Sequence, residues 1–179
     1  MVQDELDQKQ WDDLVDRLAA HDIRYFTGGR GHLAPPEVGL LPLALDLLRA
    51  PQARLHDALV ALFLRHPAAA SELAGELDLD EPVQRRVAIS IVVAAALQSE
   101  WGFSLDIYLP GQPRIEAAAL ARYLSLPRPV LDYGRPCLRA AQRALLQGAR
   151  FPFNYRAGWE DAVHRLLSQL IRDANLVGA

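Results

Sequence analysis

Hydrophobic residues recur every three to four positions along most of the chain, which is the period of an amphipathic α-helix. The first such pattern predicts a helix over residues 9–21, through Trp11, Leu14, Val15 and Leu18. The cleanest one predicts the last helix, over residues 159–171. We therefore predict a mainly α fold, a single-domain helical bundle of about seven helices.

The stretch from Val87 to Leu97 is apolar apart from Ser90, within a predicted helix that starts at Pro82 and runs to about Trp101. A helix that is apolar all round is buried on several sides, so we expect this one at the centre of the fold. The stretch is too short to span a bilayer, and no membrane partner is expected.

Two segments have the alternating period of a β-strand. Residues 103–109 alternate, with Phe103, Leu105, Ile107 and Leu109 as the apolar positions. Pro110 to Pro113 form a predicted turn, and residues 114–116 can return as a second strand. The pattern thus favours one short β-hairpin near 103–116, and residues 23–26 are predicted to form another short strand.

Composition adds bounds to this picture. Residues 1–8 are predicted to be a polar tail, and residues 9–179 a single helical domain. Apolar residues make up 51% of the chain and charged residues 23%, the balance of a folded protein. A single cysteine excludes an internal disulfide, and the acidic N-terminus lacks the apolar core of a secretory signal. We expect a soluble, cytoplasmic protein.

Residues 71–87, which include the sequence Glu72-Leu73-Ala74 and Leu77, resemble the helix-turn-helix of winged-helix regulators. The resemblance implies a helix-turn-helix-like segment over 55–101, with the 103–116 hairpin as the wing, in a winged-helix-like core. It places the possible nucleic-acid contacts at the start of the second helix, at Gln84, Arg85 and Arg86. This sequence differs from the usual pattern in having Asp78 in the turn.

Residues 122–156 carry seven arginines and one acidic residue, Asp132. Arginine binds phosphates and carboxylates through paired hydrogen bonds, so this segment is a candidate partner-binding surface. Arg135, Arg139 and Arg143 are four positions apart and align on one helical face. The candidate partner-binding residues are Arg135, Arg139, Arg143, Arg150, Arg156 and Tyr155. Alternatively, the arginines are only solvated while the aromatic residues dock the last helix.

No catalytic set emerges from the remaining polar residues. The glycine loop at 28–31 lacks the Lys-Ser/Thr ending of a phosphate-binding loop, although its backbone could hold an anion. No histidine pair has metal-ligand spacing, and no serine lies in a Gly-x-Ser-x-Gly motif. Cys137 lies between Arg135 and Arg139 near a helix start, which lowers a thiol pKa, but burial is the alternative. We expect no enzyme activity, no metal and no cofactor.

Two functions of different classes remain. The first is a non-catalytic helical adaptor or regulatory subunit that binds another protein, or a second copy of this chain. The second is a nucleic-acid-binding regulator that uses the arginine-rich last third of the chain, where the net charge is positive. Binding to duplex DNA or RNA across a salt series separates the two, because phosphate contacts weaken steeply with salt.

Overall fold

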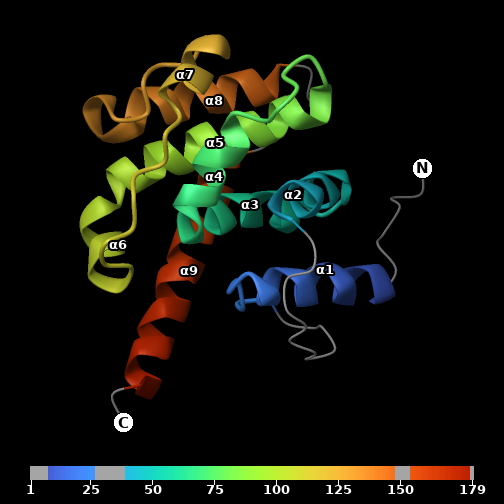
Figure 1. Ribbon diagram of the computed structural model, residues 1–179, viewed down its shortest axis with the longest axis vertical. Helices are drawn as coiled ribbons and strands as arrows, with labels where there is room; N and C mark the ends of the chain where they lie inside the picture. Colours follow the sequence, from blue (N-terminus) through green and yellow to red (C-terminus); the bar gives the residue numbers. More distant parts are fainter. Residues whose placement is uncertain (1–7, 27–38, 148–153, 178–179) are drawn as a thin grey trace.

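The computed structural model describes residues 8–26, 39–147 and 154–177, and the described residues form helices and connections without a β-strand (Figure 1). The predicted mainly α fold is confirmed. The elements are α1 (Gln8–Ala20), α2 (Leu40–Arg49), α3 (Ala53–Arg65), α4 (Pro67–Ala74), α5 (Pro82–Glu100), α6 (Gly102–Tyr108), α7 (Ala118–Tyr123), the 3-10 helix η1 (Leu131–Gly134), α8 (Arg135–Leu146) and α9 (Tyr155–Val177).

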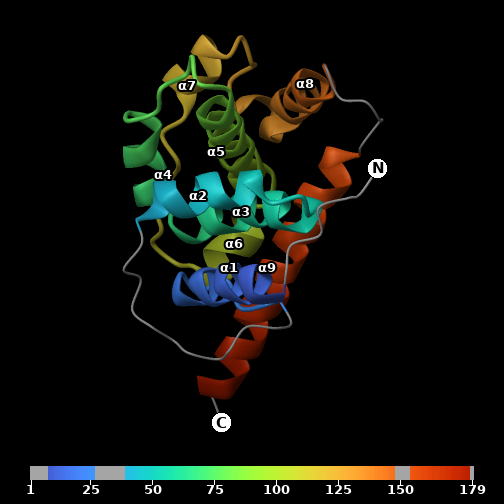
Figure 2. The same ribbon diagram turned by 90° about the vertical axis from the view of Figure 1, so that its right-hand side faces the viewer.

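Helix α5 is the centre of the fold, as its apolar composition predicts. The Glu81 side chain caps its first turn by accepting a hydrogen bond from the Gln84 amide, and Pro82 occupies the first helical position. Apart from Ser90, the residues from Val87 to Leu97 are buried. Their partners are α2, α3, α7 and α8, which surround α5 (Figures 1 and 2).

Helix α9 packs along α3 and extends past the other helices at its C-terminal end (Figures 1 and 2). It begins at Tyr155, four residues earlier than the sequence pattern predicts, because the apolar period only becomes visible at Trp159. Val163 and Leu166 on this helix are completely buried. The α3–α9 contact therefore joins the middle of the chain to its C-terminal part.

The predicted hairpin near 103–116 is wrong, because residues 102–108 form the helix α6. The alternating apolar residues also lie four positions apart in pairs, and the helix buries one pair, Leu105 and Leu109, while Phe103 and Ile107 stay exposed. Helix α6 turns from α5 by 88°. Over so short a segment, apolar residues at every second position fit a strand, but every fourth position also fits a helix.

The second half of the predicted hairpin has no regular secondary structure, and its backbone pairs with a side chain instead of a strand. The buried Gln98 amide donates to the Pro113 carbonyl at 2.9 Å and accepts from the Ile115 amide at 2.8 Å. In the same way, the Gln169 side chain donates to the Asp22 carbonyl and accepts from the Arg24 amide. The strand predicted at 23–26 is therefore also wrong, since helix α9 satisfies this backbone through one glutamine.

Across the described residues, no single helix is both long and apolar enough to cross a membrane. Helices α5 and α6 meet that length and composition test only when taken together, with the 88° bend between them. The glycine loop at 28–32 and Arg150 lie outside the described residues, so their predicted roles stay predictions.

Candidate functional site

The arginines of α8 lie on its solvent side. Cys137, Leu138 and Ala141 are fully buried against the core. Arg135, Arg139 and Arg143 are exposed, one turn apart from each other along the helix. The alignment expected from the sequence is thus present, and it leaves three guanidinium groups facing solvent over about two turns of helix.

The segment before α8 has an unusual backbone. Asp132, Tyr133 and Gly134 follow one another in the left-handed region, with φ of 46°, 56° and 76°. This conformation is costly for residues with a Cβ, and it persists only where packing enforces it. Gly134 supplies that packing, since its Cα lies against the Ala96 backbone of α5 and a Cβ there would collide with the Ala96 carbonyl.

The packed turn leaves apolar side chains in solvent. Val130 is 73% exposed, Leu131 52% and Tyr133 68%. We call these three residues together with Arg135, Arg139 and Arg143 the arginine–apolar surface. The apolar residues directly precede α8 in the chain, and η1 packs against α8. Exposed apolar residues mark protein-binding sites, where aromatic residues and arginine are enriched. These apolar residues are not among the predicted partner-binding residues, and the Val130-Leu131 pair was the available signal for them in the sequence.

Glu100 at the end of α5 joins two of the predicted arginines. Its Oε1 atom lies 3.5 Å from Arg135 Nε and 3.3 Å from an Arg156 terminal nitrogen. Arg156 also donates to Glu160 at 2.6 Å, and this hydrogen bond raises its pKa. The side chain of Arg156 is only 29% exposed, so this guanidinium holds α9 to α5. Arg135 retains most of its exposure at 61%.

Tyr155, the remaining predicted contact, is partly buried at the start of α9. Its ring stacks on Trp159 with centroids 6.2 Å apart. This aromatic pair packs the start of α9 against the rest of the protein. Such packing is the alternative role stated above for the aromatic residues.

The helix-turn-helix-like segment predicted over 55–101 comprises most of α3, then α4, a turn over residues 75–81, and α5. Only the first turn of α5 has exposed side chains, since the residues from Val87 on are buried or partly buried. Gln84 already accepts a hydrogen bond from the Asp78 amide within that turn. Arg85 is exposed and Arg86 partly buried. With 102–108 helical, the segment has no wing hairpin.

Burial decides between the two alternatives for Cys137, an activated thiol and a core side chain. The Cys137 side chain is completely buried, and burial raises the pKa of its thiol to about 12, so the flanking arginines do not activate it. Within the described ranges, no three His, Cys, Asp or Glu side chains are grouped as metal ligands.

The comparisons with known proteins found no relative. No family model matches the chain, and no curated protein or solved structure matches it.

Proposed function

We propose that this protein is a non-catalytic cytoplasmic adaptor or regulatory subunit that binds another protein through the arginine–apolar surface. The observation that carries the proposal is the pairing of three aligned arginines with Val130, Leu131 and Tyr133, which a strained turn holds in solvent. A partner that fits this surface carries carboxylates for the arginines and an apolar side chain or two for the turn.

Charge supports an acidic partner. Arg139 and Arg143 have no ion-pair partner among the described residues, and Arg135 shares Glu100 with Arg156. Unpaired arginines at an interface both steer association and form paired hydrogen bonds with carboxylates. The same chemistry suits phosphates, so nucleic acid is the second candidate, in which the arginines of α8 bind the backbone.

The first test is a charge reversal that leaves Glu100 undisturbed. A protein partner is first isolated with the wild-type chain and purified. We expect it to bind the variant R139E/R143E on the order of 10–100-fold more weakly than the wild type. The matched control R49E/R172E makes the same change of net charge on α2 and α9, and it should bind normally. Both variants should melt close to the wild type, because exposed charges contribute little to stability.

A second variant separates the two candidate functions. V130S/L131S removes the apolar anchors and keeps every charge. A protein partner should lose affinity in this variant, whereas duplex DNA or RNA should not. The wild type could instead bind nucleic acid strongly, with an affinity that falls steeply with salt and is lost in R139E/R143E. That result would favour a nucleic-acid-binding regulator. Retention of the partner by both variants would place the binding surface elsewhere.

A further inference from the structure

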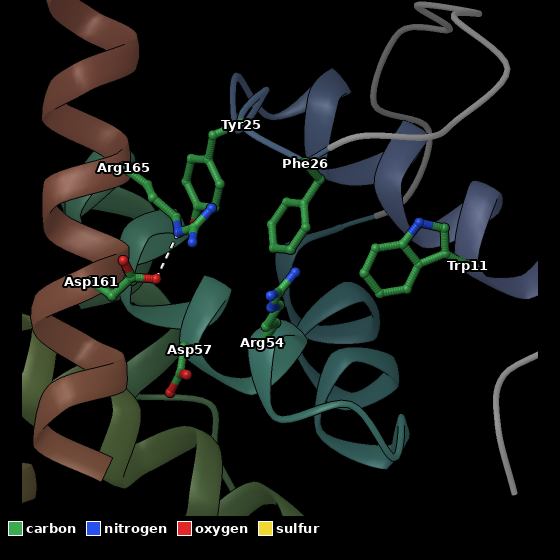
Figure 3. Close-up of a pocket in the computed structure, with 8 residues that line it drawn as sticks. Trp11, Tyr25, Phe26, Arg54, Asp57, Asp161 and Arg165 are labelled. Carbon is green, nitrogen blue, oxygen red and sulfur yellow. Dashed lines mark hydrogen bonds and ion pairs between the residues drawn. The ribbon is translucent and has the colours of Figure 1, made fainter. Parts of the chain in front are cut away.

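A cavity of about 100 Å³ lies between α1, α3 and α9, away from the arginine–apolar surface (Figure 3). Its walls come from both ends of the chain and from α3. The lining residues are Trp11, Tyr25, Phe26, Arg54, Asp57, Asp161, Ala162 and Arg165.

Aromatic rings form one side of the cavity. Tyr25 and Phe26 stack with ring centroids 4.8 Å apart, and Trp11 meets Phe26 edge-on at 5.9 Å. The Tyr25 hydroxyl is buried and has no hydrogen-bond partner within the described parts of the chain, which leaves a polar atom unsatisfied beside this wall. Aromatic faces pack well against C–H groups and attract cations.

Two opposite charges in the cavity remain unpaired. Arg165 donates to Asp161 at 2.6 Å, so that pair is satisfied (Figure 3). Asp57 and Arg54, three positions apart on α3, have no hydrogen-bond or ion-pair partner among the described residues. Figure 3 shows the Arg54 guanidinium turned toward Phe26, whereas the Asp57 carboxyl group turns toward Gly158 of α9. Asp57 is partly buried, while Arg54 is exposed.

Space for the Asp57 carboxyl group comes from Gly158 on α9. A Cβ at residue 158 would collide with the Asp57 carboxyl oxygens. Burial and the nearby Asp161 together raise the pKa of Asp57 to about 6. An unpaired carboxylate at this depth is unfavourable for the protein alone, and a bound cation would remove that cost.

We propose that this cavity binds a small free amino acid, with its ammonium group at Asp57 and its carboxylate at Arg54. The ammonium group would have Asp161 and the Tyr25 hydroxyl nearby as further acceptors, and the aromatic wall would cover the carbon atoms. The volume of about 100 Å³ is small and favours a ligand of few heavy atoms. The ligand class is therefore a small amino acid without a large side chain, such as glycine, alanine or β-alanine.

Titration calorimetry or NMR at about pH 8 tests the proposal with three kinds of probe: these amino acids, ethylamine and propionate. An amino acid should bind at least about tenfold more tightly than either half-molecule. D57N and R54Q should each weaken it by about tenfold or more, while the control D106N/R49Q, altered on α6 and α2, should not.

The pH dependence gives a separate readout. Below about pH 6, protonation of Asp57 should weaken amino-acid binding by about tenfold for each further pH unit. The other charged groups that face it are Asp161, Arg165 and Arg54, and no histidine lines the cavity among the described residues. Undetectable binding of every probe would overturn the proposal, as would equal binding by D57N. Ethylamine could instead bind as tightly as the amino acids, with an affinity that R54Q does not change. That result would overturn the proposal of an amino-acid ligand and indicate a simple amine.

Discussion

Gly134 combines two requirements at one residue, a φ of +76° and an absent Cβ against the Ala96 carbonyl. We expect Gly134→Ala to lower the free energy of unfolding by about 2–4 kcal/mol, the sum of backbone strain and overpacking. Urea denaturation measures this. Gly111→Ala is the matched control, because Gly111 has a φ of +74° with open space around it; it should cost only about 1 kcal/mol. Equal losses would mean that contact with α5 does not hold the turn.

Asp57 makes the stability of the protein depend on pH. Its pKa in the folded state, about 6, lies above the ordinary carboxyl value, so the folded state holds a proton that the unfolded chain releases. Stability should therefore fall as pH rises from about 4 to about 6. Without added ligand, Asp57→Asn should stabilise the protein by about 1–2 kcal/mol at about pH 8 and have no effect near pH 4. A gain that is equal at both pH values in urea denaturation would contradict this origin.

Among the elements, two segments without regular secondary structure, at 113–115 and 22–24, are bound by glutamine side chains. Gln98→Leu leaves the Pro113 carbonyl and the Ile115 amide without partners, and we expect a loss of about 2–3 kcal/mol. Hydrogen exchange at the Ile115 amide should become much faster, while exchange in the core of α5 should change only through global unfolding. Gln147→Leu, at an exposed position, is the control. Unchanged protection at Ile115 would mean that packing alone holds this segment.

The elements also show how far the sequence pattern reaches. Periodicity predicted α5, its burial and the exposed arginines of α8, because these follow from the helical repeat alone. It missed α6, since Phe103 to Leu109 fits two periods and the choice depends on burial of Leu105 and Leu109. The exposed turn at Val130 depends on Gly134 meeting Ala96. The cavity depends on Gly158 meeting Asp57, two positions far apart in sequence. Such contacts have no local signature.

For the whole molecule, α5 is the element that most others contact. Ile91 is completely buried at its centre. We expect Ile91→Ala to cost about 2–5 kcal/mol, a large part of a typical domain's stability, and Ile91→Asp to yield insoluble protein. Solubility after expression and thermal melting check both. A soluble Ile91→Asp variant that melts like the parent would contradict the central role of α5.

The hydrogen bond between Arg24 and Gln169 spans 145 positions. On the ribosome, the segment after α1 emerges on the order of ten seconds before its partner at typical elongation rates. During this interval α9 does not yet exist, and the face of α3 that it later covers is open to water. The nascent chain thus exposes apolar surface that chaperones recognise, and the segment after α1 reaches its final position only after Gln169 has emerged.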